Sequence, residues 1–115
     1  MYQPNFAVPS SSPQNVTAVA ISSNEIWVAW EEVPPIDQNG IIFTYEVFYY
    51  PWETFGGALM SEAINTSNKF IALDSLHPFM DYTILVRAFT SAGAGPVGTD
   101  IATTFENCKL ITIVV

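Results

Sequence analysis

The sequence predicts an all-β fold, a seven-stranded antiparallel β-sandwich. Seven short segments are β-prone or alternate between apolar and polar residues, and turn-forming residues separate them at regular intervals. No window of useful length keeps a helical period. The chain has 115 residues, half of them apolar, which fits one domain with a core of modest size.

The first two strands are expected over residues 16–21 and 25–30, with a Ser-Ser-Asn turn between them. The second strand alternates cleanly, as a half-buried antiparallel strand does. Trp27 is expected to point outward from it. The side chains expected to face the core are Val16, Ala18, Ile21, Ile26, Val28 and Trp30.

The third strand is expected over residues 41–50. Pro34 and Pro35 take the chain out of the preceding strand, because proline cannot extend a hydrogen-bonded ladder. Asn39-Gly40 readily takes positive φ and turns the chain back. On this strand Tyr45, Val47 and Tyr49 share one face, while Glu46, Phe48 and Tyr50 share the other. Two shorter strands are expected over residues 58–64, at a sheet edge, and 70–73.

The rest of the chain is organised around a long strand that begins at Tyr82. Leu76-His77-Pro78 forms the turn before this strand, and a glycine-rich loop follows it. One face of the strand carries Tyr82, Ile84, Val86 and Ala88, and the other carries Thr83, Leu85, Arg87 and Phe89. The last strand is expected over residues 99–105. We expect a linker over residues 1–12, the domain over 13–106, and a second linker or the start of a further segment over 107–115.

Residues 11–106 resemble a fibronectin type III domain. The resemblance is carried by several features in order: Trp30 with Val33-Pro34-Pro35, Asn39-Gly40 before the Tyr45 strand, Leu76-His77-Pro78 before Tyr82, and Gly93 with Gly95-Pro96. It implies an immunoglobulin-like sandwich. Tyr82 stands where such sandwiches place a tyrosine corner, whose hydroxyl bonds to backbone a few residues upstream. The expected structural core is Trp30, Tyr45, Val47, Leu76, Pro78, Tyr82, Ile84 and Val86.

Composition argues against several classes of function. The net charge of −8 repels nucleic acid and anionic lipid, which need clustered basic residues. The single histidine, His77, lies in a turn, and the single cysteine, Cys108, has no neighbouring ligands or base. We therefore expect no enzyme activity, no cofactor and no metal. The apolar tail over residues 109–115 is far too short to span a bilayer. It is the cut beginning of a membrane segment, the first strand of a next domain, or added sequence, and the last two together are favoured. We expect no direct membrane contact by the domain itself.

Two kinds of surface site are predicted. The outward face of the third and sixth strands places apolar side chains beside a charged pair, Glu46 and Arg87. This face is either a contact patch for a partner or cross-strand pairing that only stabilises the sheet. Asn15 and Asn65 begin glycosylation sequons, which matter only if the chain enters the secretory pathway. The predicted patch consists of Phe48, Tyr50, Leu85, Arg87 and Phe89.

The resemblance implies a non-catalytic interaction or spacer module in a larger cell-surface receptor, adhesion or matrix protein, with protein partners and neighbouring domains in the same chain. Its expected location is extracellular. One alternative is an accessory domain of a secreted enzyme, in which Trp27, Tyr50 and Trp52 could stack on sugars. Another is an intracellular muscle-type spacer, which a reduced, unpaired Cys108 would suit.

Overall fold

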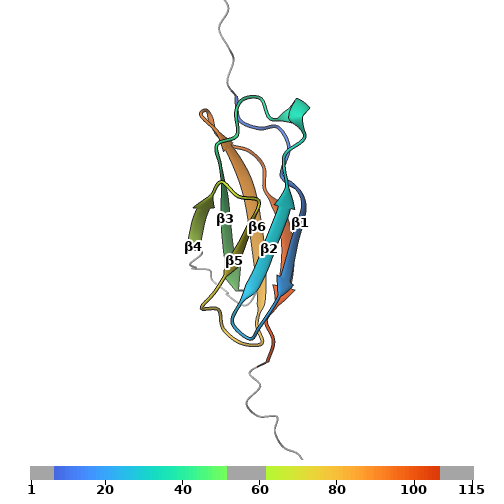
Figure 1. The fold of residues 1–115 in the computed structure, drawn as a ribbon, viewed down its shortest axis with the longest axis vertical. Coiled ribbons are helices and arrows are strands. Elements are labelled where there is room, and N and C mark those ends of the chain that lie inside the picture. The colour runs from blue at the N-terminus through green and yellow to red at the C-terminus, as the bar shows by residue number, and fades with distance from the viewer. Residues whose placement is uncertain (1–6, 52–61, 107–115) are drawn as a thin grey trace, which may run out of the picture.

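The computed structural model describes residues 7–51 and 62–106, which form two antiparallel β-sheets packed face to face (Figure 1). The smaller sheet has the order β1-β2-β5, and the larger has the order β4-β3-β6-β7, with β8 also paired to β6. The predicted all-β sandwich is confirmed. The strands are β1 (Gln14–Ala20), β2 (Ile26–Glu31), β3 (Thr44–Pro51), β4 (Glu62–Thr66), β5 (Phe70–Leu73), β6 (Asp81–Thr90), β7 (Gly93–Ala94) and β8 (Gly98–Thr103). Within the described residues, the one helical element is the short 3₁₀ helix η1 (Pro35–Asp37).

The described residues form eight strands where the sequence predicts seven, because the short strand β7 lies in the stretch expected to be a glycine-rich loop. Both β7 and β8 pair with β6, and Gly95-Pro96-Val97 separates them. A side chain on Gly95 would place its Cβ 2.7 Å from Cβ of the buried Pro9, so only glycine fits this close approach. The strand expected over residues 99–105 corresponds to β8, which spans Gly98–Thr103.

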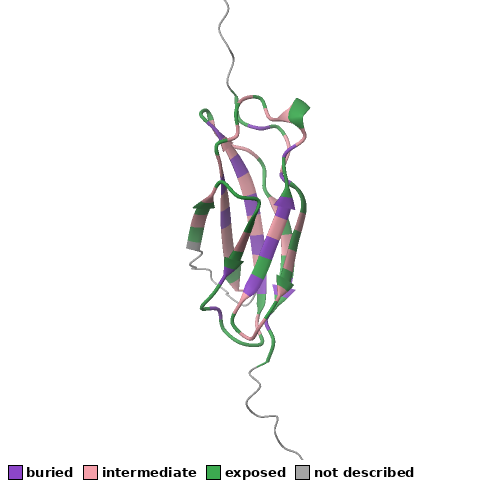
Figure 2. Ribbon diagram, viewed as in Figure 1, coloured by how far each residue is buried: buried purple, intermediate pink, exposed green. Residues whose placement is uncertain are grey.

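The core lies between the two sheets and follows the predicted alternation (Figure 2). The inward residues of β2, β3 and β6 are buried, and their neighbours along each strand are half-buried or exposed. Full burial of each aliphatic side chain contributes about 1.5–3 kcal/mol. The side chains with no exposed surface are Ile26, Val28, Val33, Val47, Ile84 and Val86.

Several sequence-based predictions are corrected. Ile21 is 48% exposed, because β1 ends at Ala20 and the Ile21 N–H donates to the Glu25 carbonyl in the turn. Pro78 is exposed in the turn before β6, where only Leu76 of the predicted core turns inward. The third strand begins at Thr44, not at residue 41.

The predicted edge strand is observed at Glu62–Thr66. The first residues of the stretch predicted for it, 58–61, lie outside the described part of the chain.

One side of the sandwich is closed by contact between its first and last strands. The carboxylate of Asp100 on β8 accepts a hydrogen bond of 2.9 Å from the backbone N–H of Ala18 on β1. This bond satisfies a backbone donor at the free edge of β1. Gly98 permits the approach, because a Cβ there would lie 2.8 Å from Cγ2 of Val16.

The start of the described chain lies against the loop that contains η1. The Ala7 N–H donates to the Asn39 carbonyl at 3.1 Å, and the Ser10 N–H donates to the Asp37 carbonyl at 2.9 Å. Thr90 at the end of β6 donates through its hydroxyl to the Ala7 carbonyl at 2.8 Å. Residues 7–12, which belong to the predicted linker, are therefore bound to the top of the sandwich.

Candidate interaction surface

The outward face of the larger sheet brings the predicted patch together. In the pairing of β3 with β6, Glu46 lies opposite Arg87, Phe48 opposite Leu85, and Tyr50 opposite Thr83. The same pairing places Thr44 opposite Phe89. Because directly opposed residues of an antiparallel pair point to the same side of the sheet, these side chains form adjacent rows. We call the set Glu46, Phe48, Tyr50, Leu85, Arg87 and Phe89 the arginine patch.

Arg87 lies at the centre of the arginine patch and is bound on three sides. Its Nε and Nη2 atoms both lie 2.7 Å from Oε1 of Glu46. Its Cζ atom lies 5.2 Å from the ring centroid of Phe48 and 5.5 Å from that of Phe89. Cation–π contacts at exposed sites stabilise by about 0.5–1 kcal/mol each. The cross-strand pairing is therefore present in the structure.

The arginine patch offers apolar surface more than charge. The side chain of Arg87 is 35% exposed, and its charge is neutralised by Glu46, itself 18% exposed. Tyr50 is exposed, while Phe48, Leu85 and Phe89 are half-buried. Such a surface suits contact with another apolar or aromatic surface and gives little long-range attraction to charged ligands.

The register extends the same face to the last strand, which the sequence analysis missed. Ile101 on β8 lies opposite Thr83 and is exposed, and Thr99 lies opposite Leu85. Alternation within the predicted last strand placed Ile101 on one of two faces, but only the β6–β8 pairing shows that it borders the arginine patch.

The two predicted glycosylation residues lie on different sheets. Asn65 is exposed on β4 and lies directly opposite Glu46 of the arginine patch. Asn15 lies on β1 at a bulge, with φ of 50°, and its Nδ2 donates a 2.9 Å hydrogen bond to Oε1 of Glu31. The sequons are therefore separated by the thickness of the sandwich.

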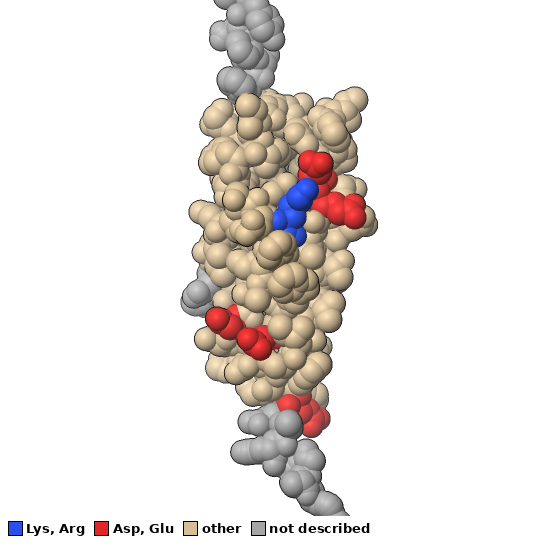
Figure 3. Space-filling model, viewed as in Figure 1, with Lys and Arg blue, Asp and Glu red and all other residues tan. Residues whose placement is uncertain are grey.

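A second exposed apolar area occupies the outward face of the smaller sheet. Trp27 and Phe70 stack there with ring centroids 5.2 Å apart and an interplanar angle of 19°. Val19 lies opposite Trp27 and is exposed as well. Figure 3 shows this side of the molecule, with β2 in front as in Figure 1, and charged side chains gather there only in small groups. Trp52, the other tryptophan proposed for stacking, lies outside the described residues.

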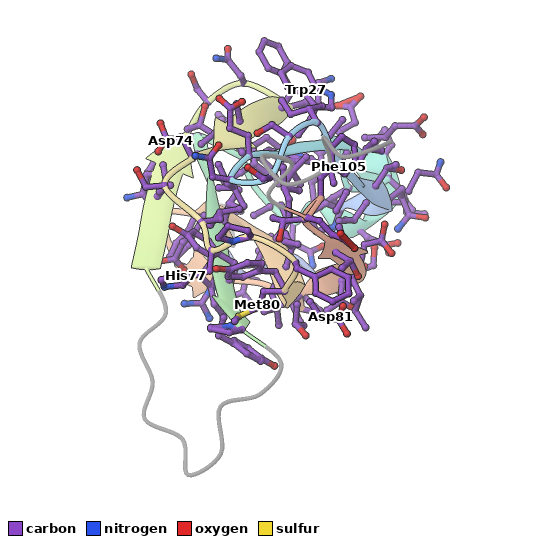
Figure 4. All side chains as sticks on the ribbon, turned by 90° about the horizontal axis from the view of Figure 1, so that it is seen from below. Trp27, Asp74, His77, Met80, Asp81 and Phe105 are labelled. Atoms are coloured by element: carbon purple, nitrogen blue, oxygen red, sulfur yellow. The ribbon has the colours of Figure 1, made fainter. Side chains whose placement is uncertain are left out.

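At the lower end, side chains hold the turn that precedes β6 (Figure 4). The hydroxyl of Tyr82 accepts a 2.8 Å hydrogen bond from the His77 N–H, which is the geometry of a tyrosine corner. The hydroxyl of Thr104 donates to the His77 carbonyl at 2.7 Å and accepts from the Met80 N–H at 3.0 Å. His77 therefore contributes backbone groups to a fixed turn. The buried Thr104 was not identified from the sequence.

The centre of the core contains the aromatic pair Trp30 and Tyr45. Trp30 packs edge to face against Tyr45 with ring centroids 5.5 Å apart. Nε1 of Trp30 is buried without a hydrogen-bond partner. Burial raises the pKa of Tyr45 above 10.0, and the nearby Glu32 carboxylate adds to the increase. All residues of the predicted core except Pro78 are buried.

The described residues contain neither a cluster of metal-ligating side chains nor a membrane-spanning helix. Within them, no three His, Cys, Asp or Glu side chains lie close enough to hold a metal ion. Nor does this part of the chain contain a helix with the length and apolar character to cross a bilayer. Cys108 lies outside the described residues.

Comparison with known proteins adds a family and relatives. The fibronectin type III domain family matches residues 11–104. The chain is 38% identical over 89 residues to protein sidekick-2 of Gallus gallus, covering 77% of this chain and 4% of that protein. It is 35% identical over 101 residues to the cell adhesion molecule DSCAM of Homo sapiens, covering 85% of this chain and 5% of that protein. It is 35% identical over 94 residues to tyrosine-protein phosphatase 99A of Drosophila melanogaster, covering 80% of this chain and 7% of that protein.

Solved structures agree with the fold. The fibronectin type III domain of human contactin 1 matches with a TM-score of 0.75 and 27% identity, over 93% of this chain and 87% of that one. The chicken CNTN1 FN1–FN3 domains match with a TM-score of 0.72 and 30% identity, over 85% of this chain and 31% of that one. The chain thus spans only a small part of the curated relatives it matches, 4% to 7% of the three described above.

Proposed function

Because the chain belongs to the fibronectin type III family, we propose that it is a non-catalytic protein-interaction module in the extracellular part of a larger cell-surface adhesion protein. The relative DSCAM, a cell adhesion molecule, supports this class of parent. The chain covers only 4% of sidekick-2 and 5% of DSCAM, which supports neighbouring domains on the same chain. We propose residues 13–106 as the boundaries of the module. The match to tyrosine-protein phosphatase 99A likewise covers only 7% of a much longer chain.

One observation indicates that the arginine patch is the surface that binds a partner. The arginine patch is an exposed sheet face on which the one arginine of the chain is neutralised and bracketed by two phenyl rings. A preorganised arginine beside aromatic rings is the composition found at the centre of protein interfaces. We infer that a partner protein contacts this face through its own apolar or aromatic side chains.

The test measures binding of the whole chain, made in a bacterial host, to an array of cell-surface extracellular domains. Phe48→Ser removes a ring from the arginine patch, and Phe70→Ser is the matched control, because Phe70 is an outward phenylalanine on the opposite sheet. Thermal unfolding of both variants checks that they remain folded. We expect Phe48→Ser to weaken binding and Phe70→Ser to leave it unchanged. Binding that depends on Phe70 alone would contradict the assignment of the arginine patch.

The stacked pair of Trp27 and Phe70 favours a second candidate function, a carbohydrate-contacting accessory domain. Exposed aromatic faces can pack against the apolar faces of sugar rings. Tyr50 cannot share this platform with Trp27, because the two residues lie on opposite sheets. Retention of the chain on a polysaccharide column that is lost in Trp27→Ala and kept in Tyr50→Ala would support this function.

A further inference from the structure

The sequon at Asn65 and the arginine patch occupy the same row of the larger sheet. Glu46 on β3 lies opposite Asn65 on β4 and, on its other side, opposite Arg87 on β6. Neighbouring strands lie about 4.8 Å apart. The strand positions of Asn65 and Arg87 are therefore only about 10 Å apart, and the two side chains point to the same side of the sheet.

The surroundings of Asn65 leave space for a sugar. Its outward neighbour on β4 is Ala63, which lies opposite Phe48 and is exposed. The methyl group of Ala63 covers less of the β4 side of the Phe48 ring than a longer side chain would. Phe48 is the diagonal neighbour of Asn65, about 7–8 Å away and within reach of an attached ring. Both contacts from Arg87 use Oε1 of Glu46, so Oε2 lies outside that pair and can accept a hydrogen bond from a sugar hydroxyl.

We propose that Asn65 carries an N-linked glycan whose first sugar lies over Phe48 and Glu46, so that glycosylation closes the arginine patch to a protein partner. This inference depends on the extracellular location in the proposed function. The apolar C–H face of the sugar packs on the electron-rich face of the ring. A protein partner and the glycan then compete for the same surface.

The modification is an ordinary group transfer. Nδ2 of Asn65 forms a bond to the anomeric carbon of N-acetylglucosamine and loses a proton. The bond that breaks joins this carbon to a polyprenyl-diphosphate carrier, which leaves as the diphosphate and takes up the proton. The sequon also requires the hydroxyl residue two positions later, which here is Ser67.

Asn15 provides the matched control within the same chain. It lies on the smaller sheet, beside Glu31, and its glycan would extend from the opposite side of the sandwich. A glycan there leaves the arginine patch uncovered. Ser67→Ala and Thr17→Ala each remove one sequon while keeping the asparagine itself.

The experiment produces the whole chain and both variants in a secreting host, maps glycans by mass spectrometry, and footprints exposed side chains with hydroxyl radicals. We expect Asn65 to be occupied, and the oxidation rate of Phe48 to rise several-fold in Ser67→Ala but to stay unchanged in Thr17→Ala. Trp27, on the other sheet, serves as the internal reference and should keep the same rate throughout. Trimming the glycan to its first sugar should preserve most of the protection of Phe48.

Two results would overturn the inference: an unmodified Asn65 in the secreted chain, or an occupied Asn65 with the same Phe48 oxidation rate as Ser67→Ala. The binding experiment with unglycosylated protein reports separately on the proposed function. If Phe48→Ser leaves partner binding intact there while the glycan still protects Phe48, the assignment of the patch to a partner fails, and with it the competition, while the position of the glycan over Phe48 stands.

Discussion

Trp30 and Tyr82 are both buried aromatic side chains with one polar atom, but that atom has different surroundings. Trp30 lies at the centre of the core, and its Nε1 has no partner. Tyr82 lies near the lower end, and its hydroxyl accepts a hydrogen bond from the turn that precedes its own strand. Trp30 therefore stabilises the fold by packing alone, while Tyr82 packs in the core and also fixes the turn before β6.

The difference separates two sources of stability in one small domain. Removing the Trp30 ring creates a cavity but leaves no hydrogen-bonding group newly unpaired. Removing the hydroxyl of Tyr82 keeps the ring and leaves the backbone N–H of His77 unpaired. The following predictions, from the largest expected effect to the smallest, test whether the two sources are distinct.

Trp30→Ala should lower the free energy of unfolding by about 3–5 kcal/mol, because it removes a large ring from between the sheets. This is a large share of the stability of about 5–15 kcal/mol that is typical of a domain. Urea denaturation followed by circular dichroism measures the change. A loss below about 1 kcal/mol would mean that the core does not depend on this ring, since such small losses are typical of surface positions.

Thr104→Val should destabilise by more than the Tyr82 change described next, since it removes two hydrogen bonds of the turn at once. The valine can neither accept from the Met80 N–H nor donate to the His77 carbonyl. Each unpaired group costs about 1–3 kcal/mol when it is buried. Amide hydrogen exchange at Met80 should accelerate in this variant. Unchanged exchange at Met80 would show that water replaces the hydroxyl without cost.

Tyr82→Phe should lower the free energy of unfolding by about 1–3 kcal/mol while the shape of the core is kept. The control is Tyr50→Phe, because Tyr50 is an exposed tyrosine on the neighbouring strand β3, where loss of the hydroxyl should change stability little. A denaturation midpoint that Tyr82→Phe leaves unchanged would contradict the structural role of the corner.

The smallest effect concerns pH and Tyr45, the partner of Trp30. Its pKa is raised above 10.0 in the folded protein, so the unfolded chain releases the phenolic proton first as pH increases. The contribution of Tyr45 to stability is therefore complete below about pH 10 and is lost as pH rises through the folded pKa. Urea titrations measure the free energy of unfolding at pH 9 and pH 11, values on either side of the ordinary tyrosine pKa. Between these pH values, Tyr45→Phe should lose less of this free energy than the wild type. An equal loss in both proteins would assign the effect to other groups.

Much of the fold followed from local pattern, because alternation in β2, β3 and β6 decides which residues face inward. The same patterns misplaced Ile21 and Pro78, since alternation does not show where a strand ends or how the following turn runs. Ile21 is already bonded to Glu25 within the turn after β1. Thr104 and Asp100 were missed for a different reason. Their partners, the turn before β6 and the edge of β1, are remote in sequence.

The sequence predicted which residues of the candidate site face outward, but not which of them are neighbours across the strands. Alternation alone placed Phe48 and Arg87 on outward faces. Only the register of β3 with β4 shows that Asn65 borders them, because strand pairing is fixed by the fold as a whole. Two predictions that seemed independent in the sequence, a contact patch and a modification site, therefore concern one surface.

The contact between Ala18 and Asp100 joins the first strand to the last. In Figure 1 the described chain starts at the top and finishes at the bottom, so tension applied to its two ends pulls β1 and β8 in opposite directions. Such a load acts along the Ala18–Asp100 bond and the packing around Gly98, which join the two strands. We expect the lifetime of the domain under force to be governed by its unfolding rate, and we expect this contact to contribute to that rate.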